Sequence, residues 1–162
     1  MADLVHRTAA DQLGAADPAA QGDGVTIRLI TPGRMFLVSE GRPDLAPNER
    51  RGEAPYWLWL ALDRALLVGA AAAPEGFASE VTDGLLTFEI AGAGAAAILA
   101  MGCTLDAAGD ALAPGRVAQT PFAGVKAVLY AQGSRVRFRL HAERSLGAYL
   151  LEWFTQAASA LR

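Results

Sequence analysis

Apolar and polar side chains alternate with a period of two at several places along the chain, a pattern typical of β-strands that bury one face. In residues 25–30, for example, Val25, Ile27 and Leu29 share one face. Alternating or short apolar runs predict further strands at residues 35–39, 57–60, 65–68, 85–90, 116–122, 125–131 and 135–141. The tripeptide Gln132-Gly133-Ser134 predicts a hairpin between the last two strands.

Two segments follow the 3.6-residue period of an α-helix instead. Residues 92–101 place Ala95 and Ile98 on one face, and Gly102 follows at a position that favours a helix C-terminus. A second helix is predicted to begin at Ser145, because serine is a favoured N-cap residue. Its apolar face carries Leu146, Tyr149, Leu150, Trp153, Phe154, Ala157 and Leu161.

The predicted elements between residues 85 and 161 have the order β-α-β-β-β-α. The three later strands are those predicted at residues 116–122, 125–131 and 135–141. When the first two of them are treated as one broken or paired element, the order resembles the split β-α-β arrangement of ferredoxin-like sheets. We therefore predict an α+β fold in which an antiparallel or mixed sheet carries helices on one face. Residues 25–162 are predicted to form a single domain. Residues 1–24 have no period and are predicted to be a flexible tail or arm.

Composition agrees with a folded domain and narrows its function. A chain of 162 residues with 52% hydrophobic and 19% charged residues can bury a core without disulfides. The net charge of −3 argues against a nucleic-acid-binding protein. The apolar residues 56–74 contain the adjacent charges Asp63 and Arg64, which argues against a membrane span. Residues 1–24 lack a signal-peptide pattern, so we expect a cytoplasmic protein.

The residues that usually carry catalysis are scarce. The two histidines, His6 and His141, and the one cysteine, Cys103, are widely separated, so neither a nucleophilic triad nor a metal-ligand spacing is present. A buried thiol is the favoured interpretation of Cys103, with a catalytic role as the alternative. The turn Gly92-Ala93-Gly94 resembles a dinucleotide-binding turn, but no acidic residue ends a second strand at the expected distance. Close packing of strand and helix is the favoured interpretation. We predict no catalytic, cofactor-binding or metal-binding residue, and a small enzyme with unusual chemistry stays open.

Charged residues are distributed unevenly. Residues 65–115 contain six acidic residues and no Lys or Arg, whereas residues 116–144 contain six basic residues and one acidic residue. Alternation in the last predicted strand places Arg135, Arg137, Arg139 and His141 on one face. This face is either a solvated surface that discourages edge pairing or a docking surface for an acidic partner or anion.

Several segments in the C-terminal half, in order and at fitting distances, resemble one known family. They are Glu80-Val81-Thr82-Asp83-Gly84, Gly102-Cys103-Thr104-Leu105-Asp106, Pro114-Gly115-Arg116-Val117-Ala118-Gln119-Thr120, Ala123-Gly124-Val125, Arg144-Ser145, Tyr149-Leu150 and Glu152-Trp153. The family is the gamma subunit of heterotetrameric sarcosine oxidase. The resemblance covers residues 80–158, and the first half of the chain matches more loosely.

The resemblance implies a fold like the folate-binding domain of glycine-cleavage aminomethyltransferases. It also implies a non-catalytic subunit that supports assembly with the large flavoprotein subunit of an enzyme that oxidatively demethylates sarcosine and transfers the one-carbon unit to tetrahydrofolate. FAD, FMN and NAD would lie in the larger subunits and zinc in the small delta subunit, with no cofactor in this chain. Isolated from its partners, such a subunit would self-associate weakly.

Two functional hypotheses follow from these observations. For an assembly subunit, the candidate partner contacts are Arg116, Gln119, Thr120, Arg135, Arg137, Arg139 and Trp153. Trp153 is otherwise a core residue of the last helix. The alternative is a free-standing folate-binding protein related to the aminomethyltransferases. In that hypothesis Asp83 or Glu89 would bind the pterin and Arg116 the glutamate tail.

Overall fold

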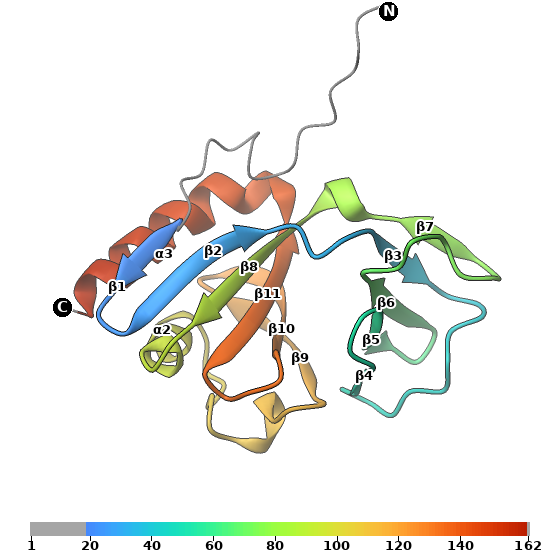
Figure 1. Ribbon diagram of the computed structural model, residues 1–162, viewed down its shortest axis with the longest axis horizontal. Helices are drawn as coiled ribbons and strands as arrows, with labels where there is room; N and C mark the ends of the chain where they lie inside the picture. Colours follow the sequence, from blue (N-terminus) through green and yellow to red (C-terminus); the bar gives the residue numbers. More distant parts are fainter. Residues whose placement is uncertain (1–18, 162) are drawn as a thin grey trace, which may run out of the picture.

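The computed structural model describes residues 19–161, which form two antiparallel sheets and two α-helices in three layers (Figure 1). The six-stranded sheet has the strand order β1-β2-β8-β11-β10-β9. Its strands are β1 (Ala20–Gly22), β2 (Val25–Ile30), β8 (Leu85–Ala91), β9 (Val117–Phe122), β10 (Val125–Ala131) and β11 (Arg137–Glu143). The five-stranded sheet has the order β4-β5-β6-β3-β7. Its strands are β3 (Met35–Val38), β4 (Arg50–Arg51), β5 (Tyr56–Ala61), β6 (Arg64–Val68) and β7 (Ala78–Glu80).

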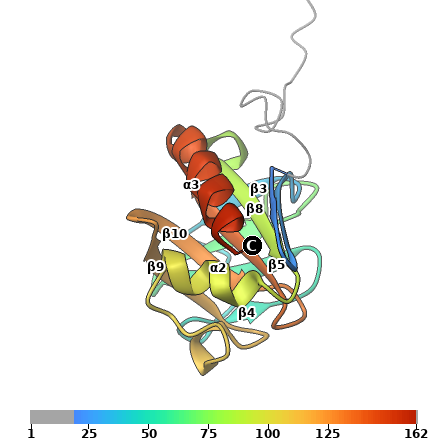
Figure 2. The same ribbon diagram turned by 90° about the vertical axis from the view of Figure 1, so that its left-hand side faces the viewer.

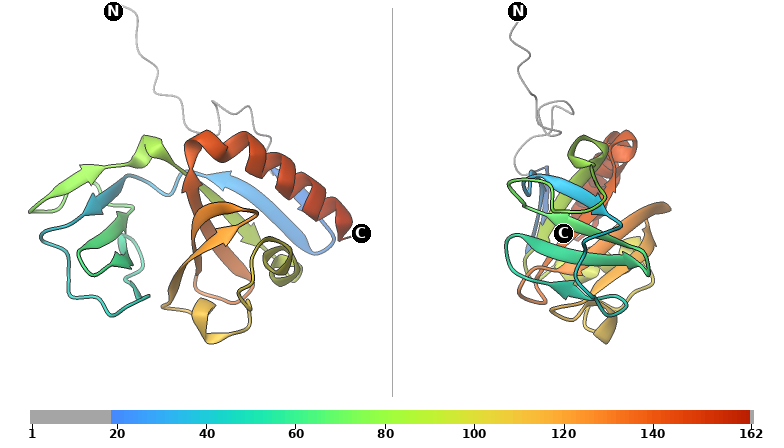
Figure 3. Two further views of the ribbon diagram at one scale, coloured as in Figure 1. Left: turned by 180° about the vertical axis from the view of Figure 1, so that it is seen from behind. Right: turned by 90° about the vertical axis from the view of Figure 1, so that its right-hand side faces the viewer.

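The helices cover one face of the six-stranded sheet, as predicted. Figure 2 shows α2 (Ala95–Gly102) and α3 (Gly147–Ala160) on the near side of this sheet. The five-stranded sheet lies on the opposite side and faces the viewer in the right-hand view of Figure 3. Short 3-10 helices lie between the other elements: η1 (Thr82–Gly84), η2 (Asp110–Leu112) and η3 (Arg144–Leu146).

The predicted split β-α-β arrangement is present. Strands β8 and β10 both run antiparallel to β11, which lies between them, so β8 and β10 are parallel to each other. Helix α2 and strand β9 connect them in sequence, and β9 pairs with β10 as a hairpin. The α+β class with helices on one face is therefore confirmed, and every strand pair within the described residues is antiparallel.

Three details of the sequence-based prediction are wrong. Strand β1 lies inside the predicted tail, because residues 20–22 pair with β2, while residues 1–18 lie outside the described part. Residues 41–55, where no strand is predicted, contain β4, which pairs with β5. Helix α3 begins at Gly147 after the 3-10 turn η3, so Ser145 is not its N-cap. The single-domain prediction for residues 25–162 stays a prediction.

Two hydrophobic cores lie on the two faces of the six-stranded sheet. The first is enclosed by the helices, and its aromatic centre is formed by Phe88, Phe122 and Phe154 with ring centroids 5.0–5.6 Å apart. The second lies between the sheets, where Tyr130 of β10 packs against Tyr56 of β5. Because both faces are covered, the six-stranded sheet is the central layer of the protein.

The segment 48–51 joins the two sheets by backbone hydrogen bonds. The Arg50 N–H donates to the carbonyl of Gly115 over 2.8 Å, and the Val117 N–H donates to the carbonyl of Asn48 over 2.9 Å. The Trp59 N–H of β5 donates to the carbonyl of Glu49 over 2.9 Å. One stretch of chain thus satisfies backbone groups of both sheets, and we call it the inter-sheet seam.

Gly102 is the last residue of α2. Its φ is not positive, so a left-handed backbone conformation does not explain why this residue is glycine. A Cβ atom at this position would lie 2.4 Å from two ring carbons of Phe122. The Phe122 ring is itself held by Trp153 and Phe154, with centroids at 5.0 and 5.6 Å. Glycine is therefore required by the close approach of helix and strand.

We predict that Gly102→Ala destabilises the protein by roughly 1–2 kcal/mol, because the methyl group displaces a tightly packed ring at a cost larger than the gain in helix propensity. Urea unfolding followed by circular dichroism measures the change. Gly84→Ala is the matched control, because nothing lies within 4 Å of its added Cβ. Equal stability of the two variants would contradict this account.

Candidate functional site

The face of the six-stranded sheet that looks toward the five-stranded sheet carries two cross-strand rows of side chains. In register, Arg28, Glu89, Arg139, Tyr130 and Val117 form the first row. The neighbouring row consists of Ile30, Thr87, His141, Val128 and Gln119. Directly opposed residues point to the same side of a sheet, so these polar groups gather between the two sheets.

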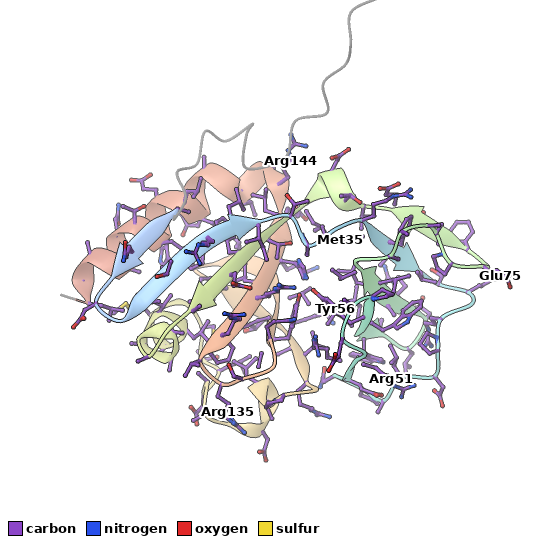
Figure 4. The ribbon with its side chains drawn as sticks, viewed as in Figure 1. Met35, Arg51, Tyr56, Glu75, Arg135 and Arg144 are labelled. Atoms are coloured by element: carbon purple, nitrogen blue, oxygen red, sulfur yellow. The ribbon has the colours of Figure 1, made fainter. Side chains whose placement is uncertain are left out.

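Five residues form one chain of hydrogen bonds, which we call the junction network. Four of them, Thr87, His141, Tyr130 and Arg139, belong to the two rows, and the fifth, Tyr56, faces them from β5. His141 Nδ1 lies 2.8 Å from Thr87 Oγ1, and its Nε2 lies 2.9 Å from the Tyr130 hydroxyl. The Tyr130 and Tyr56 hydroxyls are 2.6 Å apart, and Arg139 Nη1 donates to Tyr56 over 3.2 Å. Figure 4 shows Tyr56 between the two sheets. The network therefore ties β8, β10 and β11 to β5.

Burial keeps the two titratable groups at the centre of this network neutral. Loss of hydration, with a smaller contribution from the nearby charge of Arg139, lowers the pKa of His141 from 6.5 to about 3. Burial, reinforced by the neighbouring Tyr56, raises the pKa of Tyr130 well above its usual value of 10. Both ring nitrogens of His141 already have partners, so the arrangement favours a structural role over proton transfer.

A cleft of about 530 Å³ opens between the sheets beside His141. Its walls are mainly apolar, with Leu60 and Leu66 from the five-stranded sheet and Val128 from the six-stranded sheet. Polar groups are few, and they are contributed by Gln119, Thr120, Lys126, His141 and Glu143. An apolar cleft of this size with a few convergent polar groups is typical of a binding site for a small molecule.

The predicted contact residues Gln119 and Thr120 both line this cleft. Gln119 Nε2 donates to the carbonyl of Leu60 over 2.6 Å, so its side chain joins the two sheets at the cleft wall. Arg116 is exposed just before β9 and pairs through its backbone with Glu49. Trp153 is half-buried on the helical side, in an edge-to-face contact with Phe122. The structure does not gather these four residues on one surface.

The prediction that Arg135, Arg137 and Arg139 share one strand face is wrong for Arg135. Strand β11 begins at Arg137, and Arg135 precedes it and donates to the backbone carbonyls of Ala108 and Gly109. Figure 4 shows Arg135 below Tyr56 and outside the space between the sheets. Arg137 and Arg139 do share the inner face, where both approach Glu89. The role of these arginines as partner contacts stays a prediction.

The residues assigned to folate in the alternative hypothesis lie apart. Asp83 is in η1, Glu89 is held by Arg139 at 3.3 Å in the middle of β8, and Arg116 lies at the start of β9. The glycine-rich turn after β8 is also engaged, because the Gly94 N–H donates to the carbonyl of Gly24 over 2.9 Å. These contacts support the close-packing interpretation of that turn.

Other site types find no support among residues 19–161. No group of three or more potential metal ligands occurs within that range, and His6 lies outside it. Over the same residues, no helix is long and apolar enough to span a membrane. Cys103 is partly buried after α2 and packs against the helical core.

Sequence reasoning missed most of the junction network. Tyr130 is predicted only as a residue of the strand 125–131, Tyr56 only as the first residue of the apolar segment 56–74, and His141 as part of a solvated or docking face. One signal was present in the sequence: Thr87 and Glu89 interrupt the otherwise apolar strand β8 on the same face. Polar residues at alternate positions of a central strand indicate that something polar faces them.

Comparison with known proteins adds one finding. No family model and no curated protein matches the chain. Among solved structures, the chain is similar to a chain of the heterotetrameric sarcosine oxidase from Corynebacterium sp. U-96, determined in complex with pyrrole 2-carboxylate. The TM-score is 0.82 at 19% sequence identity, and the match covers 97% of this chain and 96% of that chain. The likeness confirms the fold over nearly the whole chain.

We predict that stability decreases as the pH falls below 6.5, because the unfolded chain then protonates His141 while the folded protein, with its His141 pKa at about 3, does not. From pH 7 to pH 5 this one group contributes a loss of about 2 kcal/mol. Urea unfolding at both pH values measures it, with His141→Gln as the comparison.

The variant retains every other titratable group, so the difference between the two pH dependences isolates His141. His141→Gln is less stable at pH 7, because glutamine cannot reproduce both hydrogen bonds, but its stability changes less between pH 7 and pH 5. Parallel pH profiles for the two proteins would contradict the buried neutral state of His141.

Proposed function

We propose that this chain is a non-catalytic, gamma-type subunit of a heterotetrameric sarcosine oxidase and that it supports assembly with the large flavoprotein subunit. The observation that carries the proposal is the extent of the structural match. It covers 96% of a chain from such a heterotetramer and 97% of this one. The proposal that this chain is an equivalent component rests on this fold-level analogy.

The state of the polar groups supports a non-catalytic role. A general acid or base needs a pKa near the working pH and access to the substrate. His141 is fully buried with a pKa of about 3, and Arg139 and Glu89 are paired with each other. The polar residues between the sheets hold the sheets together. In the proposed complex FAD, FMN, NAD, zinc and tetrahydrofolate are bound by other chains.

Exposed apolar side chains support a role in assembly. Leu62 is 82% exposed and Phe77 is 65% exposed. The side chain of Arg42 donates to the carbonyl of Leu62, and the N–H of Ser39, three residues earlier, donates to the carbonyl of Phe77. Leu62 and Phe77 therefore lie at the same end of the five-stranded sheet. Large apolar side chains exposed together are typical of surfaces that a partner covers. We therefore expect weak self-association of the isolated chain and a cytoplasmic complex.

We predict that the affinity-tagged chain, purified from its native host, elutes with larger subunits and is yellow from their flavins. Mass spectrometry identifies the co-purified chains, and the absorbance spectrum reports the flavin bands. An unrelated tagged protein from the same host is the control. A colourless chain that elutes alone would contradict the proposal.

A free-standing folate-binding protein is the second candidate, and the cleft between the sheets is the observation that favours it. Its volume of about 530 Å³ and its apolar walls suit a flat aromatic ligand. Trp59 packs against the core between the sheets, which shares Leu60, Leu66 and Val128 with the cleft walls, whereas Trp153 lies on the helical side.

If folate binds there, titration with tetrahydrofolate quenches tryptophan fluorescence at micromolar concentrations. The quenching is smaller in Trp59→Phe and persists in Trp153→Phe, because Trp59 packs against the core that shares residues with the cleft walls and Trp153 lies on the helical side. Gln119→Ala weakens binding, since Gln119 lines the cleft. An unchanged emission spectrum in the wild-type protein would remove this candidate.

A further inference from the structure

Three arginines lie at the junction of the sheets, and two of them approach one carboxylate. Arg139 Nη2 lies 3.3 Å from Glu89 Oε2, and Arg137 Nε lies 4.0 Å from Glu89 Oε1. Arg50 approaches from the five-stranded sheet, with its guanidinium carbon 4.6 Å from the centre of the Tyr56 ring. We call Arg50, Arg137 and Arg139 the arginine cluster. With only Glu89 among them, the cluster carries a surplus of positive charge in a chain whose net charge is −3.

Arg139 is rigidly held. Its side chain is 18% exposed, and it bonds both to the Tyr56 hydroxyl and to Glu89. Arg50 is held by stacking on Tyr56 and by a 3.2 Å hydrogen bond from Nη2 to Gln132 Oε1. Positive charges that are fixed before binding lose little side-chain entropy when an anion arrives.

Two observations show that the cluster is incompletely satisfied. Arg50 Nε is buried and has no hydrogen-bond partner within the described residues. Arg137 is 55% exposed, and its 4.0 Å distance from Glu89 is too long for a hydrogen bond. The Gln132 N–H donates to the Arg137 carbonyl over 2.8 Å, and the Gln132 side chain accepts a hydrogen bond from Arg50. Gln132 therefore brings Arg50 close to Arg137. The accessible member of the cluster therefore presents its guanidinium to solvent beside two other fixed charges.

We propose that the arginine cluster binds a carboxylate of a short acidic segment in the partner subunit, with Arg137 as the direct contact. This inference rests on the proposed assembly function. A planar guanidinium donates two parallel hydrogen bonds to a carboxylate, and Arg50 and Arg139 add favourable charge behind it. The acidic chain as a whole repels a long polyanion such as a nucleic acid, whereas one or two carboxylates match the local surplus of charge.

The direct test uses the purified full-length chain and the peptide N-acetyl-triglutamate amide as the probe, measured by isothermal titration calorimetry at low and at high salt. We expect binding at low salt that weakens at high salt. Arg137→Gln should bind at least roughly tenfold more weakly, because glutamine has no charge and cannot donate the two parallel hydrogen bonds. Arg64→Gln, whose side chain is 53% exposed and pairs with the turn residue Asp63, should bind like the wild-type protein.

The overturning results are equally specific. No binding by the wild-type protein, or equal binding by Arg137→Gln, would overturn the site. Inorganic sulfate bound as tightly as the peptide would indicate a general anion site and would overturn the assignment to a protein carboxylate.

Co-purification separates this inference from the proposed function. If the wild-type chain and Arg137→Glu capture the large subunits equally well, assembly stands and the arginine cluster is the wrong contact. Capture by the wild-type chain and by Arg64→Glu, but not by Arg137→Glu, would support the cluster. If the wild-type chain captures no larger subunit, the proposed function fails, and the assignment to a partner subunit fails with it. The peptide titration then decides only whether the cluster binds carboxylates.

Discussion

The packing of the two sheets depends on pairing the polar groups that lie between them. A sheet that buries both faces is normally apolar on both sides, yet here one face presents Thr87, His141 and Arg139 to the other sheet. An unpaired polar group in such a layer costs several kcal/mol, so the packing of the layers requires partners for most of these groups. Tyr56 provides the partner from the opposite sheet. The position of β5 over β10 and β11 follows from that requirement as much as from apolar contact.

Much of the fold was predictable because its signals are local. Strands β2 and β10 follow from alternation at the observed bounds, and the order of strands and helices after residue 85 led to the split β-α-β arrangement. The sequence could not indicate a second sheet, because its strands β4 and β7 have two and three residues and carry no period. The start of α3 was also missed, because the turn η3 takes the residues expected to begin the helix.

The candidate site was less predictable than the fold for a related reason. Alternation places Arg137, Arg139 and His141 on one face correctly, but it cannot reveal what covers that face. The five-stranded sheet converts an apparently solvated row into a buried network on one side and a partly open arginine cluster on the other. The likeness to a sarcosine oxidase chain at 19% identity shows that this fold tolerates extensive substitution, as expected when hydrophobic pattern and volume are retained.

The inter-sheet seam has a consequence for how the molecule comes apart. Because the amides of Arg50 and Val117 bond across the boundary between the sheets, neither sheet can detach without breaking these backbone hydrogen bonds. Local openings in hydrogen exchange usually follow boundaries where few such bonds cross. We expect the seam to couple the two sheets during unfolding, so that exchange of the Arg50 and Val117 amides reports the separation of the sheets.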